Sequence, residues 1–75
     1  MVAKTKSTSG KLNGNLIRGF RRQRGFKSQK KLGIAAGVSR YTVTALEGGS
    51  QNQTFPTLCK IANALGVNVK DFITD

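Results

Sequence analysis

Apolar residues recur at intervals of three and four along most of the chain, and glycines or short polar groups separate the runs. This spacing places apolar side chains on one face of a helix, and Ser, Thr or Asn before a run with Gly after it is typical of helix ends. The pattern predicts five short helices: Asn15 to about Gly25, Gln29–Gly37 after a Ser28 cap, a helix that Ser39 caps and that stops at Gly48–Gly49, one from the Thr54 cap to Gly66, and one from the Asn68 cap to Phe72–Ile73. No segment alternates apolar and polar residues between turn dipeptides, so no strand is predicted. We therefore expect an all-α fold, a compact five-helix bundle.

The first fourteen residues differ in texture from the rest. Residues 1–14 are rich in Ser, Thr, Gly and Lys with scattered apolar residues, and such a segment cannot offset the entropy lost on ordering. We expect a flexible basic N-terminal arm at 1–14 and one folded domain at 15–75. In the first helix of that domain, Leu16, Ile17 and Phe20 form a narrow apolar stripe, and Phe26 returns to the core after Gly25.

Charge is distributed unevenly along the chain. The net charge is +10, and ten of the thirteen Lys and Arg residues lie within residues 1–31. From residue 32 onward, three basic residues balance three acidic ones. Such asymmetry indicates a polyanionic partner, either nucleic acid or an anionic membrane surface. The alternative, a tail and helix face kept basic for solubility, is a poor explanation for so large a charge on so short a chain.

The composition argues against several kinds of chemistry. The chain has no His, three acidic residues and a single cysteine, Cys59. It therefore has no His-based or paired-carboxylate catalysis, no intrachain disulfide and no metal-ligand cluster to offer, and we expect neither an enzyme nor a cofactor. Cys59 is interpreted as a small core residue. No secretion signal or membrane-spanning run is apparent, so we expect a cytoplasmic, nucleoid-associated protein.

The second and third predicted helices satisfy several constraints together. Only a few residues around Gly37 join them, so they must cross steeply. Gly33 has no side chain and falls where the two backbones would come closest. The apolar residues that would meet at this crossing are Leu32, Ala36, Val38, Val43 and Leu46. This combination predicts a helix-turn-helix.

With these residues identified, residues Leu16 to Ile73 resemble the Cro/repressor-type (XRE-like) helix-turn-helix family of DNA-binding regulators, and thus a lambda-repressor-like domain. IRGFRRQRGF resembles the first helix of that family, SQKKLGIAAGVS the second helix and turn, and RYTVTALEGG the recognition helix. TFPTLCKIANALGVNVKDFI resembles the closing helices. One departure is visible: if Phe26 takes the family's apolar position, Lys27 is a one-residue insertion.

The third helix has a second face opposite its core side. When Val43 and Leu46 point inward, Tyr41, Thr44, Ala45 and Gly48 point outward, with Arg40 at the border. The resemblance implies that the recognition helix Ser39–Gly48 enters the major groove and assigns base reading to five residues: Ser39, Arg40, Tyr41, Thr44 and Ala45. Arg40 suits guanine, and the Thr44 methyl and Ala45 suit a thymine methyl. The alternative is a plain solvated helix face.

Phosphate contacts are expected on both sides of this helix. The resemblance places them at the start of the second helix and in the loop after the third: Ser28, Gln29, Lys30 and Lys31, and Ser50, Gln51 and Asn52. That loop lacks the Lys or Arg that the family often has there. Lys4, Lys6 and Lys11 could follow a neighbouring minor groove, and a plain disordered tail is an equal alternative.

Two further residues stand out against the family pattern. The resemblance pairs Glu47 with an arginine of the first helix in a structural ion pair, which we assign to Arg21, or to Arg22 if the insertion lies elsewhere. Ile34 stands where the family usually has a polar residue. It is either a tolerated surface residue or part of a contact with a partner.

The leading hypothesis from the sequence is a sequence-specific transcriptional regulator that binds double-stranded DNA. It would act as a homodimer on an operator, with pairing that could depend on DNA and a small seam around Phe72. No membrane and no small-molecule ligand is expected as a partner. Two alternatives remain: an antitoxin-type DNA-binding protein whose main partner is a toxin, and a nucleic-acid or membrane binder acting through charge alone.

Overall fold

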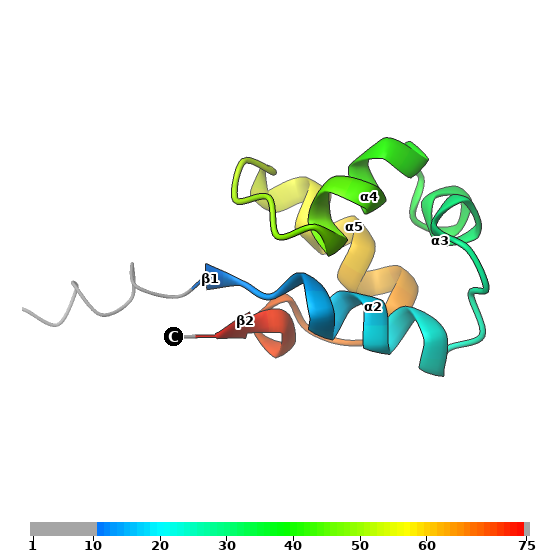
Figure 1. The fold of residues 1–75 in the computed structure, drawn as a ribbon, viewed down its shortest axis with the longest axis horizontal. Coiled ribbons are helices and arrows are strands. Elements are labelled where there is room, and N and C mark those ends of the chain that lie inside the picture. Colours follow the sequence, from blue (N-terminus) through cyan, green and yellow to red (C-terminus); the bar gives the residue numbers. More distant parts are fainter. Residues whose placement is uncertain (1–10, 75) are drawn as a thin grey trace, which may run out of the picture.

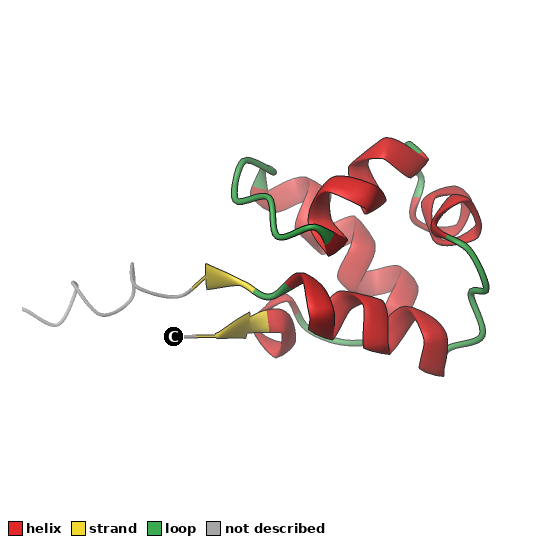
Figure 2. Ribbon diagram, in the orientation of Figure 1, coloured by secondary structure: helices red, strands yellow, loops and turns green. Residues whose placement is uncertain are grey.

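The computed structural model describes residues 11–74 (Figure 1). A short strand comes first, four α-helices follow, and a 3-10 helix and a second strand end the described chain. In chain order these elements are β1 (Lys11–Leu12), α2 (Gly14–Gln23), α3 (Gln29–Ala36), α4 (Arg40–Glu47), α5 (Phe55–Leu65), η1 (Val69–Phe72) and β2 (Ile73–Thr74). Among residues 11–74 the fold is thus mostly helical, and the strands lie only at its two ends (Figure 2).

The prediction of a fifth α-helix is wrong. Residues Val69–Phe72 form a single 3-10 turn, which begins after Asn68. The Asn68 N–H donates to Asp71 Oδ2 at 2.8 Å, so the predicted capping interaction is present at its start. The helix does not continue because Ile73 has extended backbone and belongs to β2. Four α-helices and one short turn therefore replace the predicted five-helix bundle.

The two short strands were not predicted. β1 and β2 pair antiparallel, with Lys11 opposite Thr74 and Leu12 opposite Ile73. The ladder continues into the start of α2, where the Asn13 N–H donates to the Phe72 carbonyl oxygen at 2.8 Å. Two-residue strands are too short to show an alternating pattern, so hydrophobic periodicity cannot indicate them. Figure 1 shows β1 and β2 side by side, away from α3 and α4.

The domain begins earlier than we expected. Leu12 is buried in the core, Asn13 Oδ1 accepts from the Asn15 N–H at 3.0 Å, and Gly14 is the first residue of α2. Residues 11–14 of the predicted arm are therefore part of the fold. Residues 1–10 of that arm, including Lys4 and Lys6, lie outside the described residues.

The core lies among the four helices and η1. Its fully buried large side chains are Ile17, Leu32, Val43, Leu46, Ile61, Leu65 and Phe72. Burying one such side chain stabilises a fold by about 1.5–3 kcal/mol. Phe26 packs against this cluster, as the sequence predicted, but Leu16 is 36% exposed, so the apolar stripe of α2 is narrower than expected.

Candidate nucleic-acid interface

The crossing of α3 and α4 depends on Gly33. A Cβ atom at this position would lie 2.8 Å from the Val38 carbonyl oxygen, closer than carbon and oxygen atoms can approach. The Val38 N–H in turn donates to the Gly33 carbonyl at 2.9 Å. Gly37 between them adopts a left-handed conformation with φ 76°, which costs other residues energy. These two glycines hold α4 across α3 and so leave the other side of α4 uncovered.

The uncovered side of α4 begins with an arginine and a tyrosine. Tyr41 is 70% exposed, and Arg40 Nη2 donates to Tyr41 Oη at 3.3 Å. The guanidinium carbon lies 5.1 Å from the centre of the Tyr41 ring, within range of a cation–π attraction. Ser39 precedes them, and its hydroxyl accepts from the Thr42 N–H as an N-cap. The N-terminal turn of α4 therefore presents one cation held against an exposed aromatic ring.

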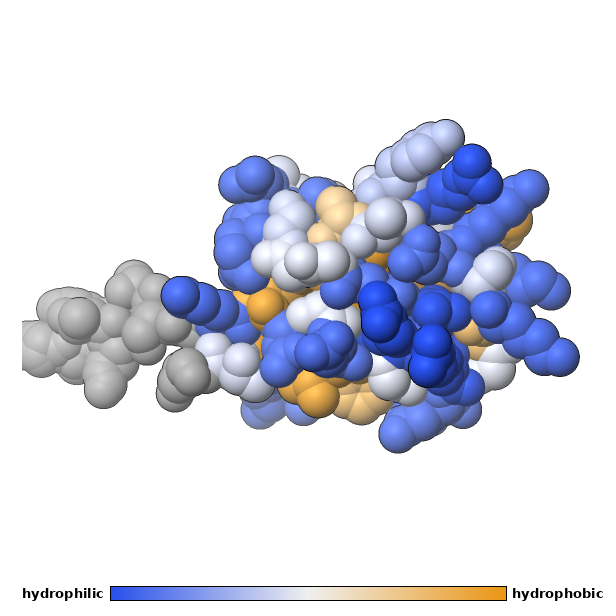
Figure 3. Space-filling model, viewed as in Figure 1, coloured by the Kyte–Doolittle hydropathy of each residue, from blue (hydrophilic) through white to orange (hydrophobic). Residues whose placement is uncertain are grey.

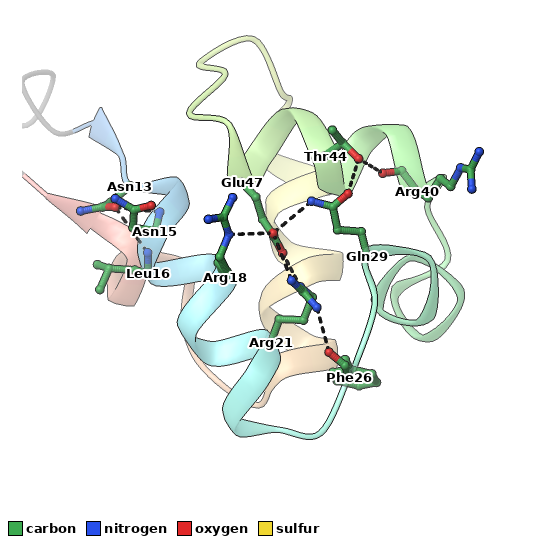
Figure 4. A network of polar contacts seen from close by, with 10 residues as sticks. All are labelled: Asn13, Asn15, Leu16, Arg18, Arg21, Phe26, Gln29, Arg40, Thr44 and Glu47. Carbon is green, nitrogen blue, oxygen red and sulfur yellow. Dashed lines mark hydrogen bonds and ion pairs between the residues drawn. The ribbon is translucent and has the colours of Figure 1, made fainter.

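The buried side of α4 ends in an ion pair. Arg21 and Glu47 are 6% and 4% exposed, and Arg21 Nε lies 2.5 Å from Glu47 Oε2. Arg21 also donates through Nη1 to the Phe26 carbonyl oxygen at 3.0 Å. Of the two arginines that the sequence left open, the one in contact with Glu47 is Arg21. Figure 4 shows this pair between α2 and α4.

A second arginine joins the same carboxylate. Arg18 Nε lies 3.3 Å from Glu47 Oε1, and the Arg18 side chain is 45% exposed. Sequence reasoning missed this contact, although Arg18 precedes Arg21 by three residues and so lies on the same helix face. Glu47 therefore connects the core to a charged surface residue.

The ionisation of Glu47 follows from these contacts. Burial by itself raises the pKa of this carboxyl, but hydrogen bonds from Arg21, Gln29 and Arg18 and the charge of Arg21 together outweigh burial. The net effect lowers the pKa below its ordinary value of 4.5, so the side chain is a carboxylate at neutral pH.

The side chain of Gln29 does not project freely from the start of α3. Its Nε2 donates to Glu47 Oε1 at 3.1 Å, and its Oε1 accepts from the Thr44 hydroxyl at 2.5 Å. Thr44 is exposed and also lies 3.0 Å from the Arg40 carbonyl oxygen. A predicted phosphate-contacting residue and a predicted base-reading residue are thus bonded to each other (Figure 4).

The other predicted phosphate residues divide into two groups. Ser28 caps α3 by accepting from the Lys31 N–H at 3.1 Å, and the side chains of Lys30 and Lys31 are exposed beside it. In the loop after α4, Asn52 donates its N–H to Ser50 Oγ at 3.3 Å. The first group carries cations at a helix N-terminus, and the second offers only neutral polar groups.

Gln51 in that loop has a structural contact that the sequence did not indicate. Its Oε1 accepts from the Leu12 N–H at 3.0 Å, and its Nε2 donates to the Leu12 carbonyl at 3.1 Å. Both ends of the amide are therefore engaged with β1. No pattern in the sequence indicates a contact between residues as far apart as Leu12 and Gln51, and the sequence analysis did not predict β1.

Much of the surface around these groups is charged or polar. Arg22, Arg24 and Lys27 are exposed at the end of α2 and in the connection to α3. The face drawn in Figure 3 is largely hydrophilic, and its hydrophobic areas are small and separate. Ala45 on α4 is half-buried, and its methyl group adds a small apolar surface next to Thr44.

Comparison with known protein families identifies the family to which this helix-turn-helix belongs. Residues 14–71 match the model of a family described as a helix-turn-helix domain. The chain belongs to the Cro/repressor-type helix-turn-helix family of DNA-binding regulators. The match starts at Gly14, two residues before Leu16, where the resemblance seen in the sequence motifs begins. No curated protein sequence matches the chain significantly.

Solved structures of this family have the same fold. The restriction-modification controller protein C.AhdI from Aeromonas hydrophila superposes with a TM-score of 0.71 at 29% identity, over 79% of this chain and 88% of that one. The biofilm master regulator SinR, solved in complex with DNA, gives a TM-score of 0.68 at 29% identity, over 76% and 90%. The P22 c2 repressor, solved with a synthetic operator, gives 0.70 at 25% identity, over 79% and 88%.

Among the described residues, no helix is both long enough and apolar enough to cross a bilayer.

Proposed function

We propose that this helix-turn-helix protein is a sequence-specific transcriptional regulator that binds double-stranded DNA with α4 in the major groove. The observation that carries the proposal is the uncovered face of α4, where Arg40 and Tyr41 project beside Thr44 and Ala45. An α-helix fits the major groove, and the first residues of a recognition helix reach the base edges. The DNA complexes of SinR and the P22 c2 repressor support this proposal.

Lys30 and Lys31 are proposed to bind phosphate on one side of the groove. They are exposed near the N-terminus of α3, where backbone N–H groups without helical acceptors also favour an anion. Ser28, Ser50 and Asn52 are proposed to assist through hydroxyl, amide or backbone donors. Gln29 and Gln51 are weaker candidates for phosphate binding, because their side chains already form hydrogen bonds within the protein.

The proposal includes a homodimer on a two-fold operator. The expected seam around Phe72 does not fit the structure, because Phe72 is fully buried. An open groove lined by Phe55, Asn68, Val69, Lys70 and Ile73 is a better surface. Phe55 is 65% exposed, and none of these residues belongs to α3 or α4, so two copies could pair there and still bind DNA.

A different partner is suggested by one exposed residue. Ile34 is 72% exposed on α3, unlike the polar residue that the family usually has there. An antitoxin-type role, in which this surface binds a toxin, is therefore a second candidate. It shares the DNA-binding domain and adds a protein partner on α3.

Binding selection from a randomised duplex pool, at roughly physiological salt, tests the leading proposal by suppressing binding through charge alone. We expect an enriched inverted repeat with half-sites about one helical turn apart. Arg40→Ala should then relax one base position by about 1–3 kcal/mol. Lys60→Ala, which removes an exposed cation of α5, is the matched control and should leave base preferences unchanged. An unenriched pool would exclude sequence-specific binding.

A further inference from the structure

The hydroxyl group of Thr44 is committed within the protein. A threonine hydroxyl has one proton to donate and two lone pairs that accept. Its two polar neighbours are Gln29 Oε1 at 2.5 Å and the Arg40 carbonyl oxygen at 3.0 Å. Both neighbours are acceptors only, so the proton points toward the protein and cannot at the same time be offered to a ligand in front of α4.

The orientation of the Gln29 amide is fixed from behind. Its Nε2 donates to Glu47 Oε1 at 3.1 Å, and an ionised carboxylate can only accept. Exchanging the amide nitrogen and oxygen would bring the amide oxygen against the carboxylate and leave Thr44 facing an NH₂ group. The two hydrogen bonds therefore run in one direction: Thr44 donates to Gln29, and Gln29 donates to Glu47 (Figure 4).

We propose that Thr44 acts as a hydrogen-bond acceptor toward DNA and selects, at the base pair it faces, a base with a major-groove amino group. Adenine presents its N6 amino group and cytosine its N4 amino group, whereas guanine and thymine present acceptors there. This inference rests on the proposed major-groove binding. An A·T pair satisfies both ends of the side chain, because it offers the amino group to the hydroxyl and the thymine methyl to the threonine methyl.

In this arrangement Gln29 is a positioning residue for specificity. It touches Thr44 and directs the hydroxyl proton inward, while Glu47 holds its amide in place. This role differs from the phosphate contact that the family resemblance implied for the Gln29 side chain. It also gives the buried carboxylate an influence on base preference through two successive hydrogen bonds.

The test is the same duplex selection, carried out on the full chain and on variants whose helical content matches it by circular dichroism. Thr44→Val removes the hydroxyl at nearly constant shape, and Thr44→Ser keeps the hydroxyl without the methyl. We expect one position of the site to prefer adenine or cytosine by about fivefold, the value of one ordinary hydrogen bond. That preference should disappear in Thr44→Val and remain in Thr44→Ser.

Gln29→Ala tests the positioning role. Removal of the nearer acceptor leaves only the Arg40 carbonyl oxygen, 3.0 Å away, to hold the hydroxyl proton. The preference for adenine or cytosine should therefore weaken at that one position, while the other positions keep their preferences. Uniform weakening across all sequences would overturn the role of Gln29. A Thr44-dependent preference for guanine or thymine, or no change in Thr44→Val, would overturn the inference while an enriched site leaves the proposed function standing. A pool with no enriched site in the unaltered protein would instead contradict the proposed function.

Discussion

The side-chain amide of Gln51 pairs with both backbone groups of Leu12, accepting from its N–H and donating to its carbonyl oxygen. The same amide donates to the Gly49 carbonyl at 2.8 Å, which ties it to the loop after α4. β2 pairs with β1 on the other side. Gln51 thus gives β1 the hydrogen bonds that a third strand would supply, and it connects the loop after α4 to the first described element.

Gln51→Ala should destabilise the domain by about 1–2 kcal/mol, because it removes two hydrogen bonds to partly buried backbone groups. Urea denaturation measures the loss, and amide exchange of Leu12 should accelerate. Asn52→Ala changes the neighbouring exposed amide, whose side chain makes no such contact with β1, and should lie within about 0.5 kcal/mol of the unaltered protein. Equal effects of the two substitutions would contradict the role given to Gln51.

Two glycines of α2 should respond in opposite directions to alanine. A Cβ atom at Gly14 would lie 2.5 Å from the Leu46 carbonyl oxygen and closer still to that of Glu47, so Gly14→Ala forces α2 away from α4. We expect a loss of about 1–3 kcal/mol. At Gly19 a Cβ atom would meet nothing within 4 Å, and Gly19→Ala should stabilise the helix by about 0.5–1 kcal/mol. Thermal unfolding distinguishes the two, and a stabilising Gly14→Ala would show that α2 and α4 are further apart.

The lowered pKa of Glu47 makes stability depend on acid pH. The carboxyl has a pKa below 4.5 in the folded state and about the ordinary value when unfolded, so its contribution is fully present above the unfolded pKa. That contribution decreases as the pH falls through the folded pKa. In the unaltered protein, we expect the free energy of unfolding to decrease as the pH is lowered below about 4.5.

Glu47→Gln isolates this contribution. The variant should be less stable at pH 7, because it leaves Arg21 buried without a counter-charge, and the gap should narrow as the pH falls below 4.5. Arg18→Ala, which removes the 45% exposed partner, should cost less than about 1 kcal/mol at pH 7. A gap between Glu47→Gln and the unaltered protein that stays constant with pH would refute the assignment.

Substitutions at Phe55 and Ile34 distinguish the proposed dimer surface, which Phe55 lines, from the surface around Ile34 that is proposed for a different partner. Both side chains are large, apolar and exposed, at 65% and 72%. If two copies pair through the groove that Phe55 lines, Phe55→Ser should weaken cooperative binding to a two-half-site duplex about tenfold or more and leave binding to one half-site unchanged. Ile34→Ser should change neither. A loss of pairing in Ile34→Ser alone would move the interface to α3.

The sequence predicted the helical domain, the four α-helices and the Ser28 and Ser39 caps because those features depend on local spacing and on residues next to one another. The Asn13 cap of α2 was not predicted, and Thr54 stands before α5 without a side-chain cap bond. Gly33 could be placed because the turn at Gly37 constrains which backbone atoms meet. β1 and β2 could not be predicted, since they depend on pairing between the two ends of the described chain. That pairing also limits the predicted last helix to the short η1 turn, and the Gln51 contact could not be predicted because it depends on β1.

The candidate site shows the same division. Arg40 and Tyr41 could be placed on the open face of α4 from helical periodicity alone. The bond between Gln29 and Thr44 could not, because it depends on the angle at which α3 crosses α4 and on the carboxylate behind them. The base-reading and phosphate-binding roles of individual residues stay predictions until they are tested on DNA.

The pairing of β1 with β2 also determines when the domain can form during its own synthesis. Leu12 leaves the ribosome early, but its partner Ile73 and the core residue Phe72 are among the last described residues to emerge. The helix-turn-helix is therefore synthesised before the fold that holds it can close, and a chain cut short before Phe72 should be a poor competitor for DNA sites. Ribosome-stalled chains of increasing length should become resistant to protease only once residues up to Thr74 are outside the exit tunnel. Resistance of chains with residues only up to Gly66 outside the tunnel would show instead that the four α-helices form a stable fold without the pairing of β1 and β2.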